Sequence, residues 1–169
     1  QETPMYHGLN GALGDWGERG GRTSLHHYLP YIKLLRAALL KLPPQSATIV
    51  HRGVHMPLNT LIPDANVGTK VVWWAFTSTS NSKDAPKRFI NSTGTLFQIS
   101  SNDGRNISRY SSKAEEEVIL LPGSQFVIDY ICRYGESEEV RMHQLQPEYA
   151  AGGEDGVDGE EIIYAEPVD

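Results

Sequence analysis

Three short runs of residues combine side-chain types that can act on charged substrates. They are Val50–Gly53 (VHRG), Phe76–Ser80 (FTSTS) and Glu115–Glu117 (EEE). The residues around each run place it at the end of an expected strand or in a turn, where side chains can meet in a cleft. An arginine, hydroxyls and carboxylates that meet there could bind a phosphate and act on a cationic centre.

The acidic run precedes the apolar stretch Val118–Leu121 and is the most informative of the three. Side chains alternate along a strand, so Glu115 and Glu117 are expected on one face and Glu116 on the other. Like charges on one face repel, which is unfavourable for stability. Such a pair suits chemistry in which one carboxylate stabilises an oxocarbenium-like transition state and the other accepts a proton. A solvated acidic turn before a buried strand is the alternative.

The other two runs leave similar alternatives. A guanidinium such as Arg52 can hold a phosphate through two hydrogen bonds, and the adjacent Gly53 would let a ligand approach the backbone closely. A structural ion pair is the alternative for Arg52. Ser78 lies in a hydroxyl-rich strand end of the kind that commonly forms turns. No G-x-S-x-G sequence surrounds Ser78, so we do not expect a hydrolase nucleophile there.

The elements that must position these runs begin with helices. Apolar residues recur at helical spacing over Tyr28–Leu39, and Pro43 follows as a terminator. A second helix, over Tyr6–Leu13, is weakened by glycines, and Asp15–Arg22 is expected to be a loop. A short helix is expected over Asp84–Asn91.

From residue 47 onward the pattern changes to short β-branched and aromatic runs separated by turn residues. Helices first and strands afterwards predict an α+β domain. Gly152–Gly159 is expected to be a polar loop. The expected strands are Ala47–Arg52, Thr69–Thr77, Thr95–Ser100, Glu116–Leu121, Gln125–Arg133, Val140–Gln146 and Glu161–Ala165.

Length and composition predict one domain over residues 1–169, and the missing initiator Met suggests a processed chain or a domain excised from a longer protein. The formal net charge of −6 disfavours nucleic-acid binding. No apolar run approaches the roughly 20 residues that span a bilayer, so no membrane contact is expected. Cys132, the only cysteine, lies in the apolar run FVIDYIC and is expected to be a buried thiol.

Metal and dinucleotide signatures are weak. The pairs His51/His55 and His26/His27 have loosely metal-like spacings without a third ligand nearby, so no metal is expected. No G-x-G-x-x-G sequence follows an expected strand, which argues against a Rossmann-type NAD site.

Taken together, Arg52, the Ser78–Ser80 triplet and Glu115-x-Glu117 resemble the R-S-E-x-E signature of arginine-specific mono-ADP-ribosyltransferases. That family includes vertebrate ecto-enzymes and clostridial-type binary toxins. The resemblance covers roughly residues 6–133 and extends to the runs YIKLLRAALLKLPP, WWAFTSTS, GTLFQI and EEEVILLPGSQFVI. It implies N-terminal helices and two packed, mainly antiparallel sheets, with the co-substrate NAD⁺ extended in the cleft between them.

The resemblance also implies a role for each site residue. Arg52 would bind the NAD⁺ phosphate or the nicotinamide ribose, and Gly53 would bind the nicotinamide amide through its backbone. Ser78 would position Glu117, which would hold the ribose 2′-hydroxyl and stabilise the oxocarbenium ion. Glu115 would orient and deprotonate the acceptor guanidinium, which is otherwise protonated near neutral pH. A glutamate at this position implies an arginine acceptor.

Some residues depart from the family pattern. His51 precedes Arg52 where many relatives have an aromatic residue. Tyr110 lies five residues before Glu115, whereas binary toxins place an aromatic three residues before; that position is Ser112 here. Lys83, Lys87 and Arg88 follow the serine run, where relatives have a phosphate-contacting loop; a solvated helix face is the alternative. Recognition of the acceptor protein is therefore the part that the resemblance defines least.

Three functions remain to be separated. The first is transfer of ADP-ribose from NAD⁺ to an arginine of a protein acceptor. The second is NAD⁺ glycohydrolysis at Arg52, Ser78 and Glu117, with water as the acceptor. The third is a non-catalytic module that binds NAD⁺ or a partner. The sequence favours a monomer and leaves the acceptor protein unidentified. A soluble chain that is secreted, or delivered as an effector, fits the resemblance.

Overall fold

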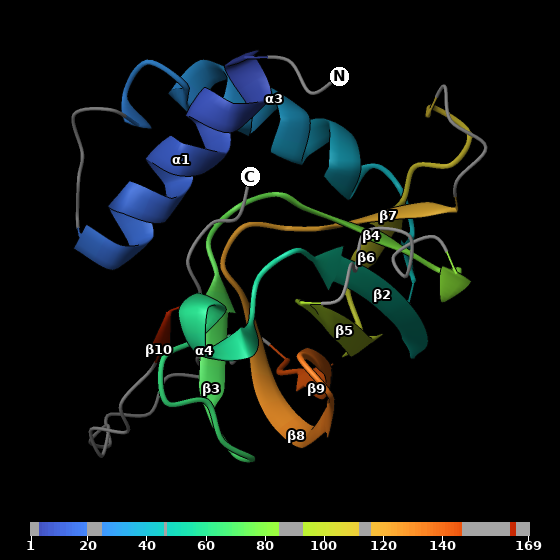
Figure 1. Ribbon diagram of the computed structural model, residues 1–169. Coiled ribbons are helices and arrows are strands. Elements are labelled where there is room, and N and C mark those ends of the chain that lie inside the picture. Colours follow the sequence, from blue (N-terminus) through green and yellow to red (C-terminus); the bar gives the residue numbers. More distant parts are fainter. Residues whose placement is uncertain are drawn as a thin grey trace, which may run out of the picture.

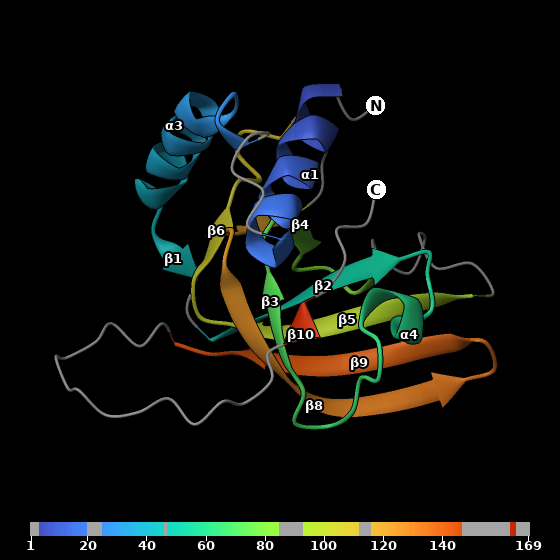
Figure 2. The same ribbon diagram turned by 90° about the vertical axis from the view of Figure 1, so that its left-hand side faces the viewer.

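The computed structural model describes residues 4–19, 25–45, 47–84, 93–111, 116–146 and 163–164. The chain begins with helices α1 (Pro4–Arg19) and α3 (Leu29–Leu40), and a short helix, α4 (Leu58–Leu61), follows later. Figures 1 and 2 show α1 and α3 together on one side of the sheet, with α4 apart from them. The helix expected over 84–91 and the loop expected over 152–159 lie almost wholly outside the described residues.

The described strands form one mixed sheet in the order β1-β6-β7-β4-β2-β5-β9-β8-β3-β10. Neighbouring strands are antiparallel except for the parallel pairs β5–β9 and β3–β10. Figures 1 and 2 show the sheet curling, with β8 and β9 on the side away from α1 and α3. The strands are β1 (Pro44–Gln45), β2 (Thr48–Val54), β3 (Lys70–Trp73), β4 (Thr77–Ser80), β5 (Gly94–Ser101), β6 (Gly104–Asn106), β7 (Glu117–Leu120), β8 (Ser124–Tyr134), β9 (Ser137–Gln144) and β10 (Ile163–Tyr164).

The single sheet differs from the two sheets that we expected. Strands β1, β6, β7 and β4 form one half, and the remaining strands form the other. The halves are joined where β2 pairs with β4, and the register of this pair contains only His51 and Ser80. By contrast, all seven residues of β2 pair with β5. The sheet is therefore continuous, but its two halves share a very short seam.

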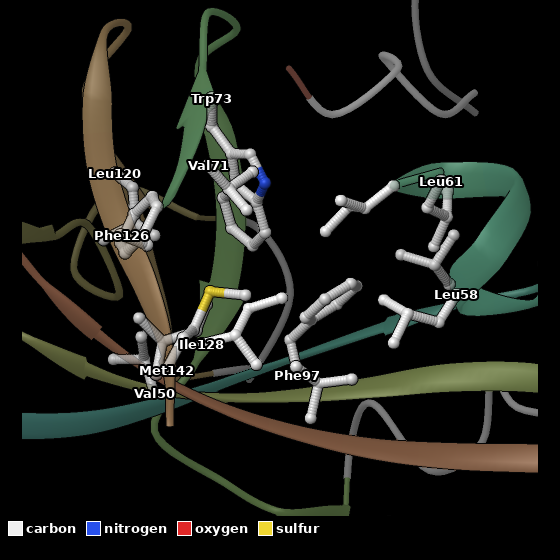
Figure 3. Close-up of a cluster of buried hydrophobic side chains, with 14 of the residues drawn as sticks. Val50, Leu58, Leu61, Val71, Trp73, Phe97, Leu120, Phe126, Ile128 and Met142 are labelled. Atoms are coloured by element: carbon white, nitrogen blue, oxygen red, sulfur yellow. The ribbon is translucent and has the colours of Figure 1, made fainter. Parts of the chain in front are cut away.

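Two clusters of buried apolar residues hold this arrangement. The larger cluster is lined by the sheet and α4, and Figure 3 shows Leu58 and Leu61 reaching from α4 toward Phe97. The smaller cluster joins α1 and α3 to the sheet through residues such as Phe76 and Leu121. Burial of apolar side chains on both faces of β7 is the main force that fixes this strand.

Two expectations about element bounds need correction. Helix α1 continues to Arg19, into the stretch expected to be a loop. Gly8 in α1 lies against the ring of Tyr28, so the glycine that weakened the helical pattern permits close packing. The strand expected over 69–77 is two strands, β3 and β4, because β3 pairs with β8 while β4 pairs with β7 and β2. Residues 74–76 belong to neither strand. The run VVWWAF is apolar throughout, so the sequence gives no sign of this break.

The expectation of a buried thiol at Cys132 is also wrong. Cys132 lies half-buried on β8, on the face opposite the core. Hydrogen bonds from the hydroxyls of Tyr134 and, to a smaller extent, Tyr130 lower the pKa of the thiol. The apolar residues next to Cys132 in sequence predicted burial of the thiol. In the structure, Cys132 is only partly buried because its side chain lies on the face of β8 that does not pack against the core.

Two glycine substitutions test the packing that this fold requires. An alanine Cβ at Gly104 on β6 would lie 2.6 Å from Cγ1 of the buried Val118, so Gly104→Ala should lower the free energy of unfolding by about 1–3 kcal/mol. An alanine Cβ at Gly11 in α1 would meet no atom within 4 Å, and Gly11→Ala should raise the same quantity by about 1 kcal/mol. Denaturant unfolding of both variants measures the difference. Equal effects of the two substitutions would contradict the packing around β6.

Candidate active site

Strand β2 places Arg52 and Gly53 beside the seam between the two halves of the sheet. The β-branched residues at its start favour an extended conformation, and pairing with β5 continues through Val54. Val50 and Val54 are buried, so the strand is fixed by the core on both sides of Arg52. Arg52 and Gly53 themselves remain half-buried and accessible.

Strands β4 and β7 bring Ser78 and Glu117 together. The strands are antiparallel, with Ser80 opposite Glu117 and Ser78 opposite Ile119, so these four side chains share one face. The hydroxyl of Ser78 donates a hydrogen bond of 2.7 Å to Oε1 of Glu117. On the opposite face, Thr79 donates to the backbone oxygen of Val118 at 2.7 Å, within the buried core.

Arg52 is tied to the same strand. Its Nη1 atom donates a hydrogen bond of 3.0 Å to the backbone oxygen of Ser78. The seam pair His51–Ser80 lies one residue from Arg52 and two from Ser78. Residues from β2, β4 and β7 therefore meet at one place, with a guanidinium and a carboxylate both in contact with Ser78. This arrangement can attract a phosphate and can also stabilise a developing positive charge.

The acidic run is only partly described. Glu115 lies outside the described residues, together with 112–114. Glu116 is exposed, and its backbone oxygen accepts a hydrogen bond from the amide of Asn81 at 3.0 Å. This bond continues the β4–β7 pairing past Glu117. The expected pairing of Glu115 with Glu117 on one face therefore stays a prediction, as do the roles of Arg52, Gly53, Ser78 and Glu117 toward a ligand.

The basic residues after β4 are likewise only partly described. Lys83 lies 3.9 Å from a carboxylate oxygen of Glu139 on β9, in a partly exposed ion pair. Lys87 and Arg88 lie outside the described residues. The segment that follows the serine run thus approaches β9, a contact that the sequence pattern did not indicate.

Sequence reasoning missed the contribution of α1 to the site. Asn10 donates a hydrogen bond of 3.4 Å to the backbone oxygen of Phe76, just before β4 begins. Phe76 is buried among residues of α1 and α3. The helices therefore support the start of the strand that carries Ser78. In the sequence, Asn10 is one asparagine in a glycine-containing stretch with weak helical periodicity, and such a residue does not by itself indicate a contact with Phe76.

Within the described parts of the chain, no group of three or more His, Cys, Asp or Glu side chains is placed to hold a metal ion. The expectation that the reaction needs no metal stays a prediction. None of the described helices has the length and apolar character that crossing a membrane requires.

Comparison with known proteins identifies the fold. The chain is 27% identical to Vis toxin, an ADP-ribosyltransferase from Vibrio splendidus, with a TM-score of 0.66 over 86% of this chain and 70% of Vis. It is 28% identical to the ADP-ribosyltransferase HopU1 of Pseudomonas syringae pv. tomato DC3000, with a TM-score of 0.66 over 85% of this chain and 67% of HopU1. The chain therefore has the ADP-ribosyltransferase fold.

The family follows from the sequence comparison. The profile of the family NAD:arginine ADP-ribosyltransferase (ART) matches residues 1–146, and the chain belongs to this family. The chain is also 34% identical over 98 residues to Mav of Mycobacterium avium (strain 104), an NAD(+)–arginine ADP-ribosyltransferase by name. That match covers 57% of this chain and only 12% of the length of Mav.

The bond between Ser78 and Glu117 is open to a direct test. Ser78→Ala removes the donor while the β4–β7 backbone pairing remains, so Glu117 loses a fixed orientation. We expect kcat for nicotinamide release from NAD⁺ to fall about tenfold to a hundredfold, the range seen when a partner that orients an active group is removed. The exposed Ser100 on β5 provides the control, and Ser100→Ala should change kcat less than twofold, as is usual for surface substitutions. An unchanged kcat in Ser78→Ala would contradict the positioning role.

Proposed function

We propose that this chain transfers ADP-ribose from NAD⁺ to an arginine side chain of a protein and releases nicotinamide. The observation that carries the proposal is the meeting of Arg52, Ser78 and Glu117 at the β2–β4 seam, with hydrogen bonds of 3.0 and 2.7 Å. Membership of the arginine ADP-ribosyltransferase family supports the same activity.

The residues at the seam fit the chemistry of NAD⁺. A diphosphate needs a cation with directed N–H groups, and the guanidinium of Arg52 is half-buried beside Ser78. Glu117 is only half-buried, so its carboxylate remains accessible to a ligand while Oε1 is held by Ser78. We place the NAD⁺ cleft at this seam, where the halves of the sheet meet, and assign the nicotinamide amide to the backbone of Gly53.

The proposed reaction breaks one C–N bond at the ribose carbon, forms another there, and transfers one proton from the acceptor to Glu115. Bound NAD⁺ supplies the ADP-ribosyl group, and the electron pair of the broken C–N bond leaves with nicotinamide. Glu117 stabilises the positive charge that develops on the ribose carbon, as carboxylates do in glycoside hydrolysis. Glu115 accepts a proton from the acceptor guanidinium, because a protonated guanidinium has no lone pair for attack. The deprotonated nitrogen of the acceptor guanidine then bonds to the ribose carbon.

Arginine is the proposed acceptor for three reasons. The residue two positions before Glu117 is Glu115, a base of the kind that a guanidinium requires. In addition, the ADP-ribosyltransferase Vis, 28% identical to this chain with a TM-score of 0.68, has been solved in complex with agmatine, a guanidino compound. Mav carries arginine specificity in its name. The identity of the acceptor protein is left open.

The proposal also covers the oligomeric state of the protein, its need for a metal ion or nucleic acid, and its site of action. We infer a monomer that acts without a metal ion and without nucleic acid, in keeping with the net charge of −6. The similarity to Vis toxin favours a protein that is secreted or delivered as an effector.

Substitution of the two acids separates transfer from glycohydrolysis, which the described site could also perform. Glu117→Ala should lower nicotinamide release and acceptor modification together by about a hundredfold or more, because both need the stabilising carboxylate. Glu115→Gln should lower arginine modification by about a hundredfold while NAD⁺ cleavage persists, because only transfer needs the base. Both products can be followed by mass spectrometry.

The outcomes of this experiment differ clearly. A similar loss of both products in Glu115→Gln would overturn the division of labour between the two acids. Turnover close to wild type in Glu117→Ala would remove Glu117 from the reaction. A folded wild-type chain that neither binds nor cleaves NAD⁺ would instead favour the non-catalytic module.

A further inference from the structure

A short link connects the arginine strand to the core. Residues His55, Met56 and Pro57 join the end of β2 to α4, and all three are exposed. Side chains from other strands hold the link at Met56, its middle residue, and at Leu58, which directly follows it. Oγ1 of Thr95 on β5 donates to the backbone oxygen of Met56 at 2.8 Å, and the amide of Leu58 donates to Oε2 of Glu138 on β9 at 2.6 Å.

These two anchors lie in one row across the sheet. Val54 pairs with Thr95, Thr95 pairs with Glu138, and Glu138 pairs with Arg133. Directly paired residues point to the same face, so the row presents its side chains toward α4. The row begins at Val54, one residue after Gly53. Its anchors hold the chain at Met56 and Leu58, a few residues beyond the two residues assigned to NAD⁺ binding.

Glu138 is suited to act as the stronger anchor. Its side chain is only 11% exposed, and its two oxygens have different partners, since Oε1 accepts from Nε of Arg133 at 3.0 Å and Oε2 accepts from Leu58. The residue at the N-cap of α4 is Pro57, which makes no side-chain capping bond. The first amide of α4 therefore depends on an acceptor from elsewhere, and a carboxylate at a helix N-terminus supplies a strong one.

The buried side chains of α4 make its displacement costly. Leu58 and Leu61 are almost fully buried and reach into the large core cluster beside Phe97, as Figure 3 shows. Glu138 thus ties the link to a helix that the core already holds. Only Val54 separates the link from Gly53 in the chain, so the position of the link bears on the end of the strand that carries Gly53.

We propose that Glu138 is a positioning residue for NAD⁺ binding, an inference that rests on the proposed function. Ser78 and Glu117 are held separately by the four-residue pairing of β4 with β7, which Glu138 does not contact. Loss of Glu138 should therefore weaken the binding of NAD⁺ and leave the chemical step of bound substrate nearly intact. In kinetic terms, KM for NAD⁺ rises while kcat is maintained.

The adjacent glutamate provides a matched control. Glu139 points to the opposite face of β9 and contacts Lys83 at 3.9 Å and Arg141 at 3.5 Å, with both cations about half-exposed. Exposed pairs at such distances contribute little to stability. Removal of Glu139 changes the net charge by the same amount as removal of Glu138 but leaves the link after Gly53 unchanged.

The experiment compares Glu138→Ala, Glu138→Gln, Thr95→Val and Glu139→Ala by steady-state nicotinamide release and by equilibrium NAD⁺ binding. Glu138→Ala should raise KM and Kd for NAD⁺ about fivefold, the size expected for loss of one helix cap, with kcat within about twofold. Glu138→Gln keeps an oxygen acceptor and should restore most of the affinity. Thr95→Val keeps the shape of the side chain and should raise KM in the same direction. Glu139→Ala should match wild type.

Hydrogen exchange at the Leu58 amide gives a readout that does not depend on activity. Protection should fall in Glu138→Ala and persist in Glu139→Ala. If Glu138→Ala does not fold, Glu138→Gln and Thr95→Val carry the comparison. An active wild type with unshifted KM and Kd in the folded Glu138 and Thr95 variants, or an equal shift in Glu139→Ala, would overturn the positioning role alone. A wild type without NAD⁺ binding or cleavage would instead remove the proposed function, and this inference with it.

Discussion

Antiparallel pairing of β4 with β7 is the constraint on which the rest of the site depends. The pairing puts Ser78 and Glu117 on one face although they are 39 residues apart in sequence, and it allows the bond of 2.7 Å between them. Strand β2 then joins β4 through one register pair, which brings Arg52 within 3.0 Å of the backbone of Ser78. A shift of β7 by one residue would turn Glu117 toward the core and replace it with Val118.

On β4 and β7, the buried residues that stabilise the fold and the residues assigned to the reaction lie on opposite faces. Val118 and Leu120 face the buried core, where Thr79 also satisfies a backbone oxygen, while Glu117 and Ser78 face the opposite side. The fully buried apolar side chains of β7 thus lie on the face away from Glu117. Clustering a guanidinium and a carboxylate costs desolvation energy, and a site that remains half-exposed keeps this cost low. The short seam between the halves of the sheet adds accessibility without breaking the sheet.

Local sequence patterns could predict most of the individual elements and the three runs that carry chemistry. Helix α3 and strand β2 follow from apolar periodicity and β-branched residues, because both signals are local. The change from β3 to β4 could not be predicted, because the run VVWWAF is apolar throughout and gives no local sign of the change of strand partner. Strand β6 was missed since Gly104 and Asn106 read as turn residues, although Gly104 is required by its close approach to Val118. Glu138 resembled any other surface acid, and only its bond to Leu58, 80 residues away in sequence, distinguishes it.

The measurement that tests the central claim most directly is incubation of the wild-type chain with NAD⁺ and agmatine, with nicotinamide release and the mass of the acceptor followed together. The geometry at the β2–β4 seam and the family of the chain predict an agmatine adduct heavier by one ADP-ribose, with one nicotinamide released for each adduct. Release of nicotinamide without an adduct would contradict transfer to arginine and favour hydrolysis by the same residues. Absence of both products from a folded chain would contradict the assignment of this site to NAD⁺ chemistry.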